Sequence, residues 1–159
     1  MTTLYVNESG EYRAANDEQV IRCAQGVIAR RFRVGSPVLS SPQRTNEFLK
    51  LRLAGLDYEV FGCLYVDSRH RLIAAEDLFR GTIDGASVHP REVVRSVILR
   101  GAAAVLLYHN HPSGQVTPSR ADELITHKLK EALQLVDVRV LDHIIVGEST
   151  YSMAEHGLI

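Results

Sequence analysis

Three side chains that could together hold a metal ion lie close to one another in the second half of the chain. His109 and His111 are two positions apart, and in extended backbone such residues point to the same face. Asp122 follows on the first turn of a predicted helix, where a loop can bring it back to the histidines. Two imidazoles and one carboxylate leave the fourth position of Zn²⁺ for water, which is the arrangement of a catalytic site.

Each part of this group also has a purely structural interpretation. Histidines at the end of a strand often serve only packing or hydrogen bonding. Ser119 and Asp122 have the spacing of a helix capping box, with Asp in place of Glu. Residues 112–114 (PSG) are typical of an ordinary turn. The joint occurrence of these features at one strand–loop–helix junction favours metal binding.

The elements that must position these side chains can be read from the flanking residues. Residues 102–108 (AAAVLLY) form a continuous apolar run, which predicts a short buried strand. A loop over 109–118 should follow, and Ser119 is a natural N-cap for a helix over 119–135. The candidate ligands should therefore lie where a central strand leaves the sheet.

The rest of the chain mixes helices and strands. Apolar residues at helical spacing, or prolines at a first turn, predict helices at 17–32, 42–54 and 90–100. Strand-forming runs predict strands at 59–66, 71–79 and 138–146, the first two joined as a hairpin, with a short strand at 4–6. This order indicates a single α/β domain whose mixed β-sheet is flanked by helices.

Composition narrows the class of protein. The 159 residues, 45% hydrophobic and 23% charged, suit one globular domain. There is no long apolar run and no signal-peptide pattern, and two cysteines make no disulfide framework, so we expect a cytoplasmic protein. The net charge of −1 lacks the basic excess typical of nucleic-acid binders.

The metal-ligand segment resembles a known signature. H-x-H, seven residues, Ser, two residues and Asp is the motif of the JAMM metalloprotease superfamily, also called MPN+ or JAB, and this chain has that spacing. The words HNHPSG at 109–114, VHPREV at 88–93 and LDHIIVG at 141–147 resemble the RadC family within it. The resemblance covers about residues 40–159. It implies a JAB/MPN, cytidine-deaminase-like domain over 37–159, preceded by an N-terminal segment, 1–36, with one helix.

The resemblance also implies catalytic roles. The superfamily has a glutamate at the start of a strand that acts on the zinc-bound water, and Glu59 is the matching position. The serine that helps to stabilise the oxyanion or to position the water is matched by Ser119. By sequence alone, three other glutamates compete with Glu59: Glu76, Glu92 and Glu123.

Two further expectations concern what lies outside the motif. Longer RadC proteins carry an N-terminal helix-hairpin-helix domain, whereas only about 40 residues precede the JAB-like domain here, so we expect a short, stand-alone form. His143, beside Asp142 in a strand, is expected to be a buried or supporting histidine and not a ligand. His127 and Glu131 are expected to form a solvated pair on one helix.

The function predicted from the sequence is a zinc-dependent, metallopeptidase-like hydrolase that uses a zinc-activated water to cleave a peptide or isopeptide bond. A peptide or protein substrate is expected, and the oligomeric state is left open. Two alternatives remain. One is nucleic-acid processing associated with DNA repair, against which the charge balance argues. The other is a metal-binding interaction module without turnover, against which the intact set of catalytic residues argues.

Overall fold

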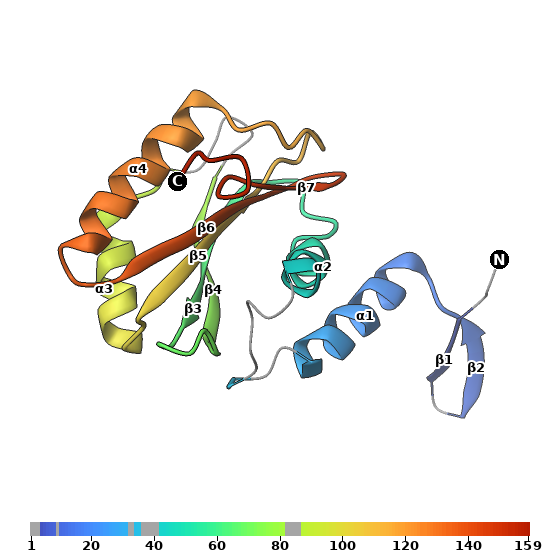
Figure 1. The fold of residues 1–159 in the computed structure, drawn as a ribbon. Coiled ribbons are helices and arrows are strands. Elements are labelled where there is room, and N and C mark those ends of the chain that lie inside the picture. The colour runs from blue at the N-terminus through green and yellow to red at the C-terminus, as the bar shows by residue number, and fades with distance from the viewer. Residues whose placement is uncertain (1–3, 9, 32–33, 36–41, 82–86) are drawn as a thin grey trace.

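A computed structural model of the chain describes residues 4–8, 10–31, 34–35, 42–81 and 87–159. In this part the element order, shown in Figure 1, is β1(Tyr5–Glu8), β2(Glu11–Ala14), α1(Asp17–Arg31), α2(Pro42–Arg52), β3(Val60–Val66), β4(Leu72–Arg80), α3(Pro90–Arg100), β5(Ala104–Asn110), α4(Arg120–Gln134), β6(Arg139–Val146) and β7(Thr150–Ser152). No helix in these ranges is long and apolar enough to cross a membrane.

A five-stranded mixed sheet forms the centre, in the order β4-β3-β5-β6-β7. β5 and β6 run parallel, and the other neighbouring strands run antiparallel. The predicted α/β class, with a mixed sheet flanked by helices, is thus confirmed. So is the predicted hairpin of β3 and β4. Its turn is held by Asp67, whose side chain accepts hydrogen bonds from the backbone N–H groups of Arg69 and Arg71, both at 2.9 Å.

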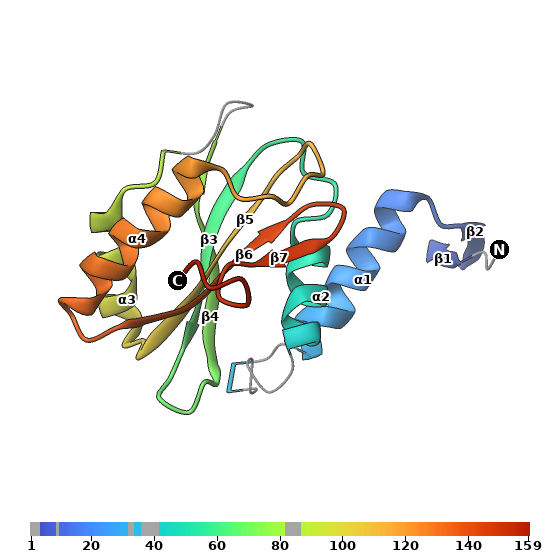
Figure 2. The ribbon, with the colours of Figure 1, turned by 45° about the horizontal axis from the view of Figure 1, so that its top comes forward.

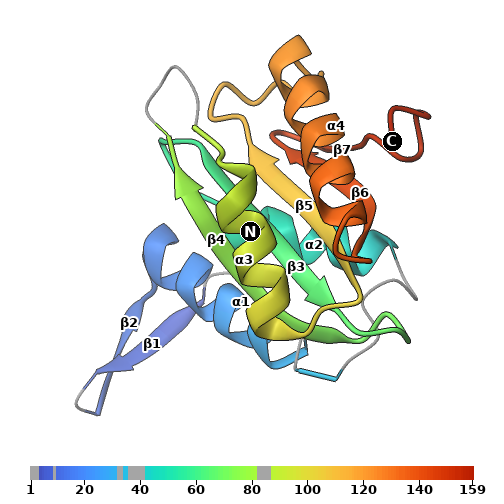
Figure 3. The ribbon, with the colours of Figure 1, turned by 90° about the vertical axis from the view of Figure 1, so that its left-hand side faces the viewer.

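Helices cover both faces of the sheet. Figure 3 shows α3 and α4 in front of the strands and α2 behind them. β3 and β5 are buried along their whole length, so their residues alternate between the two cores. Cys63 and Leu107 face α3 and α4, whereas Leu64 and Leu106 face α2. Strands buried on both faces explain why these segments read as continuous apolar runs.

The N-terminal elements lie outside these layers. α1 packs against α2, and the Gln25 side chain donates a hydrogen bond to the Leu51 carbonyl at 2.9 Å. Beyond α1, the hairpin of β1 and β2 extends away from the sheet (Figure 2). Tyr5 and Tyr12 are exposed on this hairpin.

The predicted strands differ from the structure in two respects. The strand expected to end at residue 108 continues through Asn110, because His109 and Asn110 remain paired with β6. Two strands, β2 and β7, were not predicted; both are short, and β7 is recognisable only by its pairing with β6. The proposed domain boundary between residues 36 and 37 lies outside the described residues.

Candidate metal centre

The structure brings the three predicted metal ligands together. His109 is near the end of β5, His111 directly follows that strand, and Asp122 is in the first turn of α4. The Nε2 atoms of the two histidines are 2.9 Å apart. The Asp122 carboxylate lies 3.3 Å from His109 Nε2 through Oδ1 and 3.6 Å from His111 Nε2 through Oδ2. One ligand atom from each residue therefore faces the same small volume.

Backbone hydrogen bonds explain how the loop after β5 returns α4 to the histidines. The N–H of His111 donates to the Val146 carbonyl at 2.8 Å, which extends the pairing with β6 past the end of the strand. Gly114 then turns the chain, with a φ of 84° that favours glycine. Its carbonyl accepts from the Glu148 N–H at 2.9 Å, so the loop is fixed to the β6–β7 turn.

Asp122 has a structural role and a place in the cluster at the same time. Ser119 and Asp122 form the capping box of α4: the Ser119 Oγ accepts from the Asp122 N–H at 3.1 Å, and Asp122 Oδ2 accepts from the Ser119 N–H at 2.7 Å. The Ser119 hydroxyl also donates to Oδ2 at 2.7 Å. The capping and metal-binding interpretations of this segment are therefore compatible, because the cap aims the carboxylate at the histidines.

The hydrogen bonds of His111 show which of its nitrogens is free for a metal. His111 Nδ1 is 2.8 Å from the Gln115 carbonyl oxygen, which can only accept, so Nδ1 carries the proton. In the neutral ring the lone pair is then on Nε2, towards Asp122. The separations of 2.9, 3.3 and 3.6 Å lie around the spacing of about 3.3 Å between ligand atoms of a tetrahedral zinc site with bonds of about 2.0–2.1 Å. The donor set fits Zn²⁺.

Electrostatics in the cluster favour a cation. Burial alone would raise the pKa of Asp122, but its interactions with the His109 and His111 rings, together with the hydrogen bond from the Ser119 hydroxyl, outweigh burial and hold that pKa far below its usual range. The pKa of His111 is raised, chiefly by its hydrogen bond to Asp122, and the charge of Glu59 adds to this rise. The cluster thus keeps its carboxylate ionised and attracts positive charge.

Glu59 lies at the same mouth of the sheet as the histidines. It directly precedes β3, and Phe61 in that strand pairs with His109. The Asn110 side chain bonds to the backbone on both sides of it: Oδ1 accepts from the Val60 N–H at 2.7 Å, and Nδ2 donates to the Tyr58 carbonyl at 3.0 Å. Asn110 lies between the two histidines in the sequence and is not one of the predicted ligands. Its position links the strand that carries His109 to the chain at Glu59.

Comparisons with known proteins now settle the family. The family model described as RadC-like JAB domain matches residues 39–158. This chain belongs to the RadC-like JAB domain family. A UPF0758 protein of Vibrio cholerae is 47% identical over 143 residues, which are 90% of each chain.

Two further relatives are longer than the matched region. A UPF0758 protein of Thioalkalivibrio sulfidiphilus is 61% identical over 121 residues, 76% of this chain and 54% of the relative. One from Stutzerimonas stutzeri is 50% identical over 149 residues, 93% of this chain and 66% of the relative. The chain thus spans about half the length of the Thioalkalivibrio relative.

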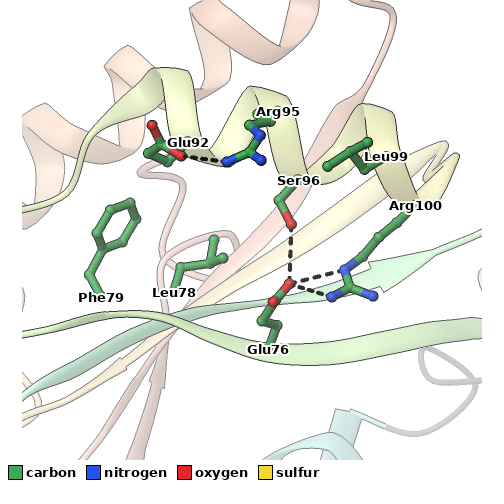
Figure 4. Close-up of a pocket in the computed structure, with 8 residues that line it drawn as sticks. All are labelled: Glu76, Leu78, Phe79, Glu92, Arg95, Ser96, Leu99 and Arg100. Carbon is green, nitrogen blue, oxygen red and sulfur yellow. Dashed lines mark hydrogen bonds and ion pairs between the residues drawn. The ribbon is translucent and has the colours of Figure 1, made fainter.

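Two glutamates that competed with Glu59 are engaged elsewhere in this JAB domain. Glu76 and Glu92 line a groove of about 430 Å³ between β4 and α3, and Figure 4 shows the residues around it. Glu76 accepts hydrogen bonds from Ser96 at 3.1 Å and from Arg100 at 2.6 Å, and Glu92 pairs with Arg95 at 3.6 Å. The third competitor, Glu123, is half-buried in the first turn of α4. Glu76 and Glu92 thus pair with arginines of α3, whereas Glu59 directly precedes the strand that pairs with the strand carrying His109.

A fourth histidine adjoins the cluster without facing its centre. His143 in β6 is fully buried, as expected for a supporting histidine. Its Nε2 is 2.8 Å from His109 Nδ1, on the side of that ring away from Asp122. His127, by contrast, is exposed on α4. A signal for the role of His143 was present in the sequence only as a polar residue within an apolar strand.

Proposed function

We propose that this RadC-like JAB domain is a zinc-dependent hydrolase that cleaves a peptide or isopeptide bond in a peptide or protein substrate. The observation that carries the proposal is the convergence of two imidazole nitrogens and one ionised carboxylate at the mouth of the sheet, with Glu59 beside them. His109, His111 and Asp122 would hold the metal. When bound there, zinc would polarise the scissile carbonyl and lower the pKa of a water to about 7.

The chain's own residues supply the proton transfers. Glu59 accepts the proton of the attacking water and passes it to the nitrogen of the leaving amine as the carbon–nitrogen bond breaks. The new carbon–oxygen bond leaves negative charge on the former carbonyl oxygen. The exposed Ser119 hydroxyl, now directed at Asp122, can turn to donate to that oxygen. Asn110 holds the backbone on either side of Glu59 and so fixes the backbone position from which this base extends.

A metal-binding module without turnover would need the His–His–Asp group but no base. The position of Glu59 at the same mouth, with its backbone anchored by a buried asparagine, favours hydrolysis over such a module. A cytoplasmic location is part of the proposal. It is supported by Cys23 and Cys63, which are both free thiols.

The test combines metal analysis with a cleavage screen on the full chain purified without chelator. We expect about one zinc per chain, which is removed by a chelator and restored by titration. The zinc-loaded protein should cleave members of a peptide and isopeptide library, and the metal-free protein should not. Failure to take up zinc on titration would overturn the proposal. So would a zinc-loaded protein that cleaves nucleic acid and no peptide.

A further inference from the structure

A chain of buried hydrogen bonds joins two of the proposed ligand residues through two residues that are not ligands. Thr126 Oγ1 in α4 is 2.5 Å from the backbone carbonyl oxygen of Asp122 and 2.6 Å from His143 Nδ1. His143 Nε2 is 2.8 Å from His109 Nδ1. The side chains of Thr126, His143 and His109 are at most 1% exposed, so water cannot substitute for any of these contacts.

The direction of the chain follows from its first member. A carbonyl oxygen can only accept, so the single hydroxyl proton of Thr126 points to Asp122, and Thr126 Oγ1 must accept from His143 Nδ1–H. With its proton on Nδ1, the neutral ring of His143 has its lone pair on Nε2. Nε2 therefore accepts from His109 Nδ1–H.

The consequence is that the lone pair of His109 lies on Nε2 and faces the cluster. His111 is held in the same tautomer by the Gln115 carbonyl. Two imidazole lone pairs 2.9 Å apart, beside a carboxylate, repel one another unless a cation lies among them. The opposite tautomer of His109 would place a proton where the metal has to bind.

We propose that His143 and Thr126 are positioning residues that fix the tautomer and ring orientation of His109 for metal binding. This inference rests on the proposed metal site and extends it to two residues outside the H-x-H, Ser and Asp signature. Partners of this kind on a ligating histidine typically change metal affinity by about 10- to 100-fold when they are removed.

Two substitutions of the same residue separate positioning from packing. In His143→Gln the amide oxygen reaches the place of the imidazole Nε2 and can accept from His109 Nδ1–H. In His143→Asn the shorter amide reaches only the place of Nδ1, so it satisfies Thr126 and leaves His109 without its acceptor. Both variants are neutral and polar, and both disturb the core.

The measurement is the zinc dissociation constant, by competition with a chelator, together with the thermal midpoint of the metal-free proteins. We expect His143→Asn to bind zinc about 10- to 100-fold more weakly than the wild type and His143→Gln to remain within about threefold. Thr126→Val, which keeps the shape and removes the hydroxyl, should weaken zinc binding in the same direction as His143→Asn.

Two results would overturn the inference. One is equal zinc affinity in the Asn and Gln variants. If any loss of zinc affinity is explained by the fall in thermal midpoint, the role of His143 is packing. The other is a wild-type protein that binds no zinc, which would also refute the proposed function. A third result would refute hydrolysis alone and support the positioning role. In it the wild type binds zinc and hydrolyses nothing, and His143→Asn binds zinc more weakly than His143→Gln.

Discussion

Two polar clusters lie on the same face of the sheet, and their charges are satisfied in different ways. Glu76 on β4 contributes a carboxylate to one cluster and Asp122 on α4 contributes one to the other. Glu76 has a permanent cation as its partner, since Arg100 approaches it to 2.6 Å. Among the described residues, the ion-pair partners of Asp122 are the histidines His109 and His111, and no arginine or lysine pairs with it.

The difference separates a stabilising network from a binding site. The guanidinium of Arg100 fills the space beside Glu76 with a charge that the protein itself supplies at every pH of interest. Beside Asp122, nitrogen lone pairs replace that guanidinium, so the positive charge must come from outside. A carboxylate near histidines is thus a better indicator of a metal site when the surrounding elements bring no arginine or lysine to it.

The largest expected effect tests this contrast directly. Asp122→Asn removes the ionised ligand and should reduce zinc content from about one per chain to nearly none. Glu76→Gln removes the matching carboxylate of the other cluster and should leave zinc content unchanged. Elemental analysis and chelator competition on both proteins provide the comparison. Equal losses of zinc in the two variants would contradict the assignment of separate roles.

The next effect separates the base from the ligands. Glu59→Gln should retain zinc and the fold but lose about 10²- to 10⁴-fold in turnover, because a positioned general base contributes about that much. Turnover on a cleaved peptide, measured with zinc content, decides the matter. Loss of zinc from this variant would instead indicate that Glu59 is a ligand. Full turnover would show that Glu59 is not the base, and Glu123 would be the next glutamate to test.

A smaller effect is expected from the residue that anchors the backbone around this base. Asn110→Leu keeps the side-chain size and removes both bonds to the chain around Glu59. Misplacement of a catalytic group can cost up to about 10²-fold, so we expect kcat to fall by about 10- to 100-fold with zinc retained. Asn16→Ala is the control for stability, since it removes a helix cap in α1. Unchanged kcat in Asn110→Leu would show that Asn110 does not position Glu59 for catalysis.

The sequence predicted the parts of this site that are local in the chain. The ligands and the Ser119 cap lie within one strand–loop–helix segment, where spacing and capping residues carry the information. The contacts of Asn110 and His143 join residues 50 and 34 positions apart and depend on strand register, which no local pattern specifies. The extension of β5 through Asn110 was missed for the same reason, because only its neighbour β6 shows that the strand continues.

The ion pair of Glu76 and Arg100 provides the smallest effect, a pH dependence of stability. Burial alone would raise the pKa of Glu76, but hydrogen bonds from Arg100 and Ser96, with the charge of Arg100, outweigh it and lower that pKa. A carboxyl whose pKa is lower in the folded than in the unfolded state stabilises the fold at pH values above its unfolded pKa, which is about 4.3. This contribution is lost as the pH falls through the folded pKa.

Glu76→Gln should therefore lower the free energy of unfolding most above about pH 5, and the gap to the wild type should narrow as the pH falls below about 4. The gap should be small even at neutral pH, because the side chains of Glu76 and Arg100 are 37% and 34% exposed and water and salt screen the pair. Denaturant unfolding of both proteins across this pH range measures it, and Glu131→Gln on the exposed side of α4 controls for the loss of one surface charge. A gap that stays constant with pH would show that Glu76 acts through packing and not through its charge, and the contrast with Asp122 would then rest on the zinc measurements alone.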